Sequence, residues 1–268
     1  MVLKQKSSEP DAGSELNIKL VIEYDGKNYS GWQRQKNNSL RANSIQETIE
    51  NSLQVLFPST KIKLIGAGRT DAGVHALNQT ANFRIDSAVL QKSRKGNLEK
   101  LKHSLNSMLP SDISIKSIGF VKKDFHSRYS AKKRIYRYML SSVKRAYNAD
   151  KYFFLKTKFD IDLAKEYCKL IEGLHSFKTM CKNKDDKHGY MSIVYYAKVK
   201  KLKDEAIEFE ICANRFLHSM VRAITGMMIS VASGKISINE FNKKFSKGEP
   251  LKIQYAPSNA LILYKIIY

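Results

Sequence analysis

The chain has 268 residues, 43% of them hydrophobic, which is enough for one large domain or two small ones. Lysines and arginines number 47 against 25 acidic residues, so the formal net charge is +22. Such a charge favours a polyanionic partner such as a nucleic acid, with lysine-rich coding as the alternative explanation. The sequence has no run of 18 apolar residues, which excludes a membrane-spanning helix.

The N-terminal segment and the cysteines bear on the location of the protein. Residues 1–16 are polar, which predicts a disordered tail rather than a secretory signal. The 3 cysteines are odd in number and their spacing fits no zinc pattern, so they predict neither a disulfide framework nor a metal site. We therefore expect a cytoplasmic protein.

The first part of the chain predicts strands and helices in the order β-α-β-β-α-β. Ser44 and Glu47 have the spacing of a capping box, and the apolar residues that follow recur at helical intervals. The expected elements are a strand at 17–24, a helix from 44 that ends before Pro58, strands at 61–66 and 79–85, a helix at 97–108 and a strand at 113–121.

The same order is expected to recur in the second part of the chain. The expected elements are a strand at 134–140, a helix that Asp160 or Asp162 caps and that runs to Gly173, strands at 192–202 and 206–213, a long helix over about 216–233, a short helix that Ser237 caps, and a strand at 261–267. Two such units predict an α+β fold of two ferredoxin-like halves, 17–125 and 126–268, whose antiparallel sheets join around a central cleft.

A glycine-rich stretch, GAGRTDAGVHALNQTANF at 66–83, begins between two of the predicted strands. Glycine permits positive φ angles and close backbone approach, so Asp71 is expected on a tight, ordered loop. Arg69, two residues earlier, would favour the charged carboxylate that a nucleophile requires. An ordinary turn with a surface ion pair is the alternative interpretation. Asp71 and His75 also suggest two metal ligands, but no third ligand is near, so we expect no metal.

Cations and aromatic residues are interleaved in a second stretch, DFHSRYSAKKRIYRYML at 124–140. This mixture suits phosphates and unstacked bases together. The candidate RNA contacts are Arg128, Lys132, Arg134 and Tyr136. The alternative is an amphipathic strand with two tyrosines in the core, because Tyr136 and Tyr138 share one face of a strand.

A third stretch, NRFLHSMVRAITGMM at 214–228, predicts a helix with an apolar face. Arg222 directly follows two residues that are expected to be buried, and from the edge of the helix it can reach a groove of the sheet. A solvated arginine is the alternative interpretation.

Together these three stretches resemble the tRNA pseudouridine synthase family of the TruA type. The resemblance runs from residue 18 through nearly the whole chain, with the matching stretches in a shared order and spacing. It also rests on YDGKNYSGWQRQ at 24–35, SIQETIENSL at 44–53, LNSMLPSDISI at 105–115 and YAPSNALILYKIIY at 255–268.

The resemblance implies an isomerase that converts uridine to pseudouridine in the anticodon arm of tRNA, at positions 38, 39 and 40. It implies a homodimer that needs no cofactor. By resemblance, Asp71 is the nucleophile, Arg69 is its ionic partner, and Arg222 pairs with it or positions it. Tyr136 is expected to contact the flipped uracil, and Leu263 is expected in the pocket wall.

Two other hypotheses compete with this one. A non-catalytic RNA-binding protein with two ferredoxin-like halves explains the charge and the fold, but not the glycine-flanked Asp71. A metal-dependent nuclease lacks a cluster of ligands in this sequence.

Overall fold

The computed structural model describes residues 14–35, 43–92, 97–182 and 189–268. Its N-terminal part contains the strands β1 (Glu15–Tyr24), β2 (Ile65–Gly66), β3 (His75–Asp86) and β4 (Ile113–Val121). The helices of this part are α1 (Ile45–Leu56), α2 (Ser87–Lys92) and α3 (Leu98–Met108).

The C-terminal part contains the strands β5 (Lys133–Ser141), β6 (Phe153–Phe154), β7 (Gly173–Ser176), β8 (Met191–Lys201), β9 (Ala206–Ala213) and β10 (Leu261–Ile267). Its helices are α4 (Ile161–Ile171), α5 (Met220–Ala232) and α6 (Ile238–Lys247). Short 3₁₀ turns occur at Ala149–Lys151, Lys178–Met180 and Ser258–Ala260.

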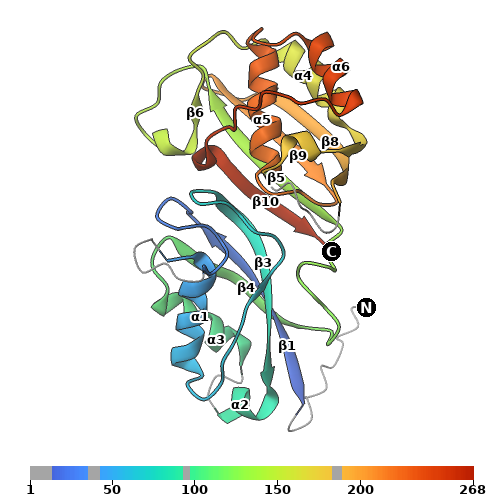
Figure 1. Cartoon of the computed structure of the whole chain (residues 1–268). Helices are drawn as coiled ribbons and strands as arrows, with labels where there is room; N and C mark the ends of the chain where they lie inside the picture. The colour runs from blue at the N-terminus through green and yellow to red at the C-terminus, as the bar shows by residue number, and fades with distance from the viewer. Residues whose placement is uncertain (1–13, 36–42, 93–96, 183–188) are drawn as a thin grey trace, which may run out of the picture.

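In the described part of the chain, all the strands belong to one sheet with the order β4-β1-β3-β10-β5-β9-β8-β7, to which β2 and β6 are added beside β3 and β5. The N-terminal strands β4-β1-β3-β2 and the C-terminal strands β10-β5-β9-β8 repeat the same ferredoxin-like order (Figure 1). The two groups meet where β10 pairs in parallel with β3, through Ile262 with His75 and Leu263 with Ala76. We call this β3–β10 junction the seam. The arrangement confirms the predicted α+β fold class.

Helices cover one face of each group of strands, and the core lies under them. Along β1, the alternate residues Ile18, Leu20 and Ile22 are fully buried, as are the inward residues of α1. Figure 1 shows α1 and α3 against the N-terminal strands, and α4, α5 and α6 gathered on the C-terminal strands. No helix of the described segments is long and apolar enough to cross a membrane.

Helix starts follow the predicted capping residues. Ser44 accepts a hydrogen bond from the N–H of Glu47 at 3.2 Å, and Asp160 accepts from the N–H groups of Asp162 and Leu163. Ser237 caps α6 in the same way, by accepting from the N–H of Glu240 at 3.1 Å. A side-chain oxygen satisfies an N–H group that the first helical turn leaves free, and this fixes where each helix begins.

Several boundaries differ from the predictions for identifiable reasons. The strand expected at 61–66 shrinks to Ile65–Gly66, because the N–H of Leu64 donates to the buried carboxylate of Glu50. Strand β1 starts at Glu15, inside the tail expected at 1–16, and the first 13 residues of that tail lie outside the described residues. The long helix starts at Met220 instead of 216. The division into halves at residues 125 and 126 stays a prediction.

Candidate active site

The loop between β2 and β3 presents Asp71 in a fixed geometry. Thr70, the preceding residue, bonds through its hydroxyl to the Tyr24 hydroxyl at 2.8 Å, and its carbonyl accepts from the N–H of Trp32 at 3.1 Å. Gly31 has a φ of 105°, and a Cβ there would lie 2.6 Å from the Thr70 carbonyl oxygen, so only glycine fits. Because Thr70 is held inward by both bonds, Asp71 has little freedom to move.

The Asp71 carboxylate points across the seam to the start of α5. Its Oδ2 accepts from Arg222 Nη1 at 3.0 Å and from Ser219 Oγ at 2.7 Å, whereas its Oδ1 lies 3.7 Å from Nε2 of His218. The side chains of Asp71 and Arg222 are only 22% and 18% exposed. The positive end of the α5 dipole also favours a carboxylate at this place. The N-terminal strands therefore supply the acid and the C-terminal ones supply its hydrogen-bond donors.

Arg222 is itself fixed by the backbone of a distant segment. Its Nε donates to the carbonyl of Ala256 at 2.8 Å, and the N–H of Ala256 donates to the Arg222 carbonyl at 3.0 Å. One guanidinium thus links the C-terminal segment to Asp71. The structure brings Arg222 and Asp71 together, and the solvated arginine considered above does not describe this residue.

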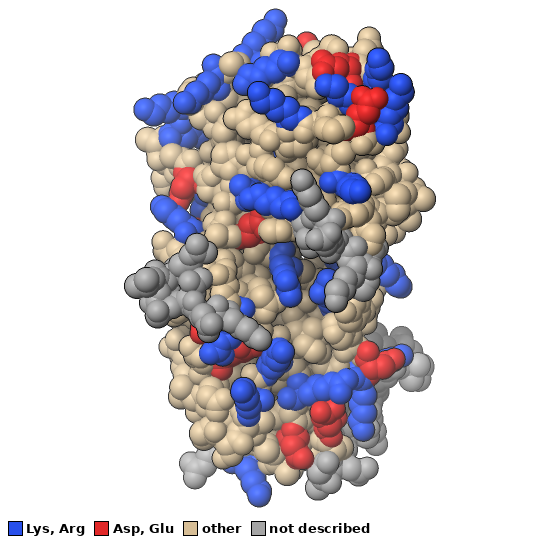
Figure 2. All heavy atoms as spheres, viewed as in Figure 1, with Lys and Arg blue, Asp and Glu red and all other residues tan. Residues whose placement is uncertain are grey.

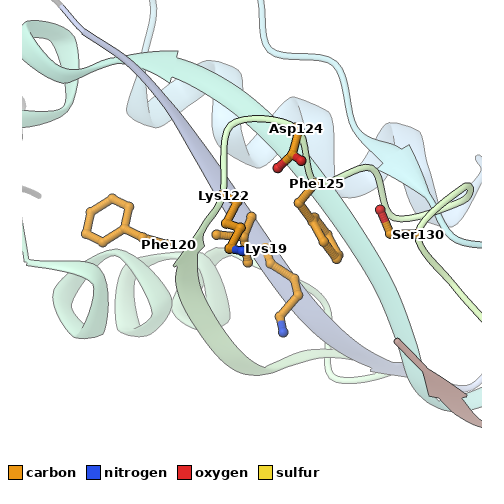
Figure 3. A pocket seen from close by; sticks show the side chains of 7 residues that line it. Lys19, Phe120, Lys122, Asp124, Phe125 and Ser130 are labelled. Atoms are coloured by element: carbon orange, nitrogen blue, oxygen red, sulfur yellow. The ribbon is translucent and has the colours of Figure 1, made fainter. Parts of the chain in front are cut away.

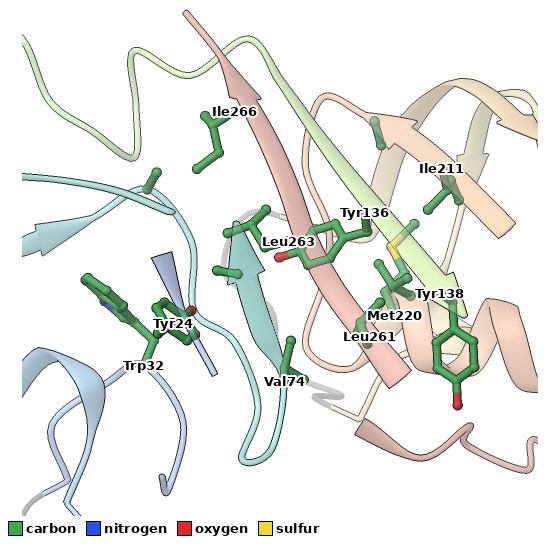
Figure 4. Packing of buried hydrophobic residues seen from close by; sticks show 14 of the residues in the cluster. Tyr24, Trp32, Val74, Tyr136, Tyr138, Ile211, Met220, Leu261, Leu263 and Ile266 are labelled. Atoms are coloured by element: carbon green, nitrogen blue, oxygen red, sulfur yellow. The ribbon is translucent and has the colours of Figure 1, made fainter. Parts of the chain in front are cut away.

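Tyr136 lies on β5 next to the seam and is 7% exposed. It pairs with Leu263 in the register of β5 and β10, and its ring meets Phe216 edge-on with a centroid distance of 5.1 Å. Figure 4 shows its ring extending from β5 toward the side of Tyr24. Burial raises the pKa of the Tyr136 hydroxyl well above its usual range, Arg134 lowers it, and the Asp71 charge raises it. The hydroxyl is therefore protonated at neutral pH.

The position of Arg69 differs from the prediction that it would be the ionic partner of Asp71. Its side chain is exposed, and within the described residues the arginine paired with Asp71 is Arg222. Arg222 reaches Asp71 Oδ2 at 3.0 Å from the other side of the seam, so an arginine of the C-terminal part takes the place expected for Arg69.

The contacts of Arg134 bear on its predicted role as an RNA contact, because its guanidinium is already engaged within the protein. Its half-buried side chain donates hydrogen bonds to backbone carbonyls from both sides of the seam, and burial lowers its pKa. The accepting carbonyls belong to Ala131 at 3.0 Å, Asn214 at 2.6 Å, Ala67 at 3.3 Å and Arg128 at 2.6 Å. The Ala67 carbonyl lies in the Asp71 loop, so Arg134 joins this loop to the segment that leads into α5.

Arg128 and Lys132 are exposed on the segment that connects β4 to β5. The Arg128 guanidinium lies 5.8 Å from the ring centroid of Tyr129, which is 71% exposed. Figure 2 shows basic side chains over both parts of one face of the molecule, including its middle, with fewer acidic ones. These residues are placed where a polyanion can reach them, and their roles as RNA contacts stay predictions.

An open pocket of about 580 Å³ lies away from Asp71, beside the start of the same connecting segment. Its lining includes Lys19, Lys122 and Phe125, and Figure 3 shows these side chains around it. None of the residues predicted for the site lines this pocket.

His75 does not act as a partner of Asp71 in a metal site. Its Nδ1 lies 3.1 Å from the N–H of Gly26 and 3.0 Å from Asp25 Oδ1, and its Nε2 lies 2.8 Å from the Asn259 carbonyl. Both ring nitrogens are therefore engaged with other groups. Across the described residues, no cluster of three or more potential ligands is present.

Two residues close to Asp71 were missed from the sequence. Ser219 and His218 come directly before α5, in a segment that the periodicity assigns to the helix itself. The sequence indicated them only through their place just before Arg222 in LHSMVR. Polar residues about one helical turn from an arginine that pairs with a carboxylate can reach the same carboxylate.

Comparisons with known proteins identify the family of the chain. The model of a family described as tRNA pseudouridine synthase matches residues 20–130 and 167–268. The tRNA pseudouridine synthase A of Acetivibrio thermocellus is 34% identical over 255 residues, covering 94% of this chain and 99% of the relative. The protein of that name from Thermodesulfovibrio yellowstonii is 36% identical over 265 residues, with 94% and 100% covered. The one from Phytoplasma mali is 36% identical over 257 residues, with 95% and 99% covered.

The fold, the carboxylate at the seam and these matches together define an RNA-modifying isomerase. The chain belongs to the tRNA pseudouridine synthase family.

Proposed function

We propose that the chain converts uridine to pseudouridine at positions 38, 39 and 40 of the anticodon arm of tRNA, with Asp71 as the nucleophile. The observation that supports this role is the pairing of Asp71 with Arg222 at 3.0 Å in a site where both side chains are largely shielded from water. A shielded carboxylate loses the water that would otherwise compete for it, while the ion pair with Arg222 holds it in place.

The reaction rearranges the nucleoside without adding an atom. The N1–C1′ bond breaks, the uracil rotates, a C5–C1′ bond forms, and the proton leaves C5 while N1 gains one. No redox or group-transfer cofactor is required for this balance. The carboxylate can attack C6, attack C1′, or remove a sugar proton to give a glycal, and all three routes need Asp71 beside a base that has left its stack.

Tyr136 is proposed to contact the flipped uracil, with Leu263 beside it in the wall of the site. Flipping a base costs a few kcal/mol, and stacking on an aromatic ring returns roughly 1–3 kcal/mol per base. Across the described residues, no hydrogen-bond partner is recorded for the Tyr136 hydroxyl, so this group is available to the substrate. Because the hydroxyl is protonated at neutral pH, it can donate a hydrogen bond to the uracil, whereas taking the C5 proton would require the tyrosinate that burial disfavours. The ring and hydroxyl roles are separable by mutation.

Recognition of three consecutive positions is proposed to rest on the shape and phosphates of the tRNA. The sequence around positions 38–40 varies between tRNAs, so hydrogen bonds to neighbouring bases cannot serve them all. The exposed Arg128 and Lys132 are proposed to bind phosphates. We further propose a homodimer that works in the cytoplasm, in which one subunit holds the tRNA body and the other modifies the uridine.

The dimer proposal is tested by mixing two inactive subunits. One carries Asp71→Ala and the other carries Lys132→Glu with further Lys→Glu changes on the basic surface. Activity above that of both parent dimers is expected in confirmed heterodimers, because each heterodimer keeps one intact tRNA-binding surface and one intact Asp71. Activity no higher than that of the parents would mean that each subunit acts alone.

The proposed reaction is tested with purified protein, an unmodified tRNA transcript and a metal chelator. Chemical mapping of pseudouridine should find product at positions 38–40 with the wild type and none with Asp71→Asn, while both bind the tRNA with similar affinity. Transcripts in which cytidine replaces uridine at one of the three positions identify which are modified. Turnover by Asp71→Asn, with deamidation ruled out by mass spectrometry, would remove Asp71 from the nucleophile role.

A further inference from the structure

Ser219 has an unusual backbone for a residue at the start of a helix. It occupies the N-cap position of α5 with φ 57° and ψ 14°, the left-handed region that residues other than glycine, asparagine and aspartate rarely adopt. Serine at this position normally bonds through its oxygen to the first turn of the helix, yet Ser219 makes no such capping bond. Its left-handed backbone therefore serves something other than the helix.

The Ser219 hydroxyl is directed at Asp71 instead. It donates to Oδ2 at 2.7 Å, and Arg222 Nη1 donates to the same oxygen at 3.0 Å. The other oxygen, Oδ1, is 3.7 Å from Nε2 of His218, which is beyond hydrogen-bond distance. The two oxygens of Asp71 are thus unequal: both donors hold Oδ2, and Oδ1 keeps its lone pairs.

Two donors on one oxygen also restrict rotation of the carboxylate. With Arg222 alone, the carboxylate can rotate about the Cβ–Cγ bond and present either oxygen to the guanidinium. Ser219 approaches from the α5 side of the same oxygen, and its own position is fixed because its carbonyl accepts from the N–H of Ala223 at 3.0 Å. Since Ser219 is only 9% exposed, water competes little for its hydroxyl.

We propose that Ser219 is a positioning residue that holds Oδ2 of Asp71 together with Arg222, so that Oδ1 is the oxygen presented to the uridine. The proposal rests on the proposed role of Asp71 and does not depend on which of the three chemical routes is followed. In each route one carboxylate oxygen must reach the nucleoside, and an oxygen already engaged with two donors is the weaker nucleophile and base.

The left-handed backbone makes a clean test possible. Ser219→Gly removes the hydroxyl and tolerates the φ angle, so relief of backbone strain offsets part of the stability lost with the hydrogen bond and the variant should fold. Ser219→Asn also tolerates this backbone and carries an amide N–H₂ that can donate to Asp71. Ser219→Ala neither tolerates the left-handed backbone nor carries a donor, so its stability shows how much the positive φ angle costs. The Gly and Asn variants form a matched pair that differs in the presence of a donor.

Steady-state kinetics on a tRNA transcript distinguish the outcomes. Ser219→Gly should lower kcat about tenfold, the change expected from losing one hydrogen bond to a charged group, with KM and tRNA affinity within about twofold of wild type. Ser219→Asn should recover a large part of the lost kcat. A Gly variant with wild-type kcat, or Gly and Asn variants that are equally slow, would overturn the role of Ser219 while the wild-type product still supports the proposed function. Absence of pseudouridine with the wild type would remove both.

Discussion

The two groups of strands share one topology but contribute different chemistry to the site. The N-terminal group supplies the acid, Asp71, on a loop held by Tyr24 and Trp32. The C-terminal group supplies the donors, Ser219 and Arg222, at the start of α5. Because neither group holds both parts, the site is complete only across the seam. The repeated fold thus supports two unlike halves of one candidate site.

Two arginines reach across the seam in contrasting ways. Arg222 forms an ion pair with a carboxylate, so we expect its charge to determine its role. Arg134 donates hydrogen bonds to backbone carbonyls, so we expect the direction of its N–H groups to determine its role. The comparison predicts that losing Arg222 slows the chemistry and that losing Arg134 weakens the fold. Tyr136, which is buried beside the seam, and Arg128, which is exposed, differ in the same way.

After the loss of Asp71 itself, the largest effect is expected from Tyr136→Phe, which keeps the ring and removes the hydroxyl. If the hydroxyl donates a proton or a hydrogen bond in the chemical step, turnover should fall roughly 10²–10⁴-fold with little change in tRNA affinity. Because burial raises the pKa of Tyr136, no rise in rate from its ionisation should appear below about pH 10. Single-turnover rates and a binding assay measure both quantities.

The matched variant for this test is Tyr136→Ala, which removes the ring as well. A Phe variant that works nearly as well as wild type, with an impaired Ala variant, assigns the ring to stacking alone. Wild-type activity in Tyr136→Ala would contradict both roles.

Arg222→Met should slow turnover about 10²-fold, because a reacting group displaced by about an ångström loses rate on this scale. The substitution leaves Asp71 held by Ser219 alone. Arg222→Lys keeps the charge but lacks the second nitrogen that reaches Ala256, so it should be intermediate. Rates within threefold of wild type for the Met variant would show that Arg222 does not position Asp71.

Arg134→Met should reduce the free energy of unfolding by about 2–3 kcal/mol, because several carbonyls, most of them partly buried, lose their donor. Urea unfolding measures this change. The salt dependence of tRNA binding, measured under conditions where the variant is folded, should stay at its wild-type slope. A weaker salt dependence of tRNA binding, with unchanged stability, would instead support Arg134 as a phosphate contact.

Arg128→Gln is the matched substitution at an exposed position and should have the smallest effect. Loss of the Arg128 charge should reduce the slope of log affinity against log salt concentration by about 1. The free energy of unfolding should stay within about 0.5 kcal/mol of the wild-type value. Filter binding at several salt concentrations gives the slope. An unchanged slope would place Arg128 outside the RNA-binding surface.

The sequence predicted the elements whose signals are local. Ser44, Asp160 and Ser237 cap helices through contacts with residues two or three positions away, and periodicity located most of the strands. Predicted boundaries were wrong where a group distant in sequence forms a contact, as when the N–H of Leu64 donates to Glu50 and the strand is shorter than predicted.

The candidate site was predictable only to the level of motifs. Asp71 and Arg222 were found through a resemblance that spans the chain, but the direction of a loop residue depends on contacts that spacing does not reveal. Arg69 is two residues from Asp71 in sequence, yet its side chain is exposed and the arginine that pairs with Asp71 is Arg222. Ser219 was hidden because a helical pattern gives no sign of one left-handed residue at its start.

The central claim is that the acid of one group of strands is held by the arginine of the other, and a double-mutant cycle tests it most directly. Urea unfolding is measured for the wild type, Asp71→Asn, Arg222→Met and the double variant. The account predicts a coupling energy within about 0.5–3 kcal/mol, as for residues in direct contact. Additive effects, with a coupling below about 0.3 kcal/mol, would contradict it, because groups that do not interact lose their contributions independently.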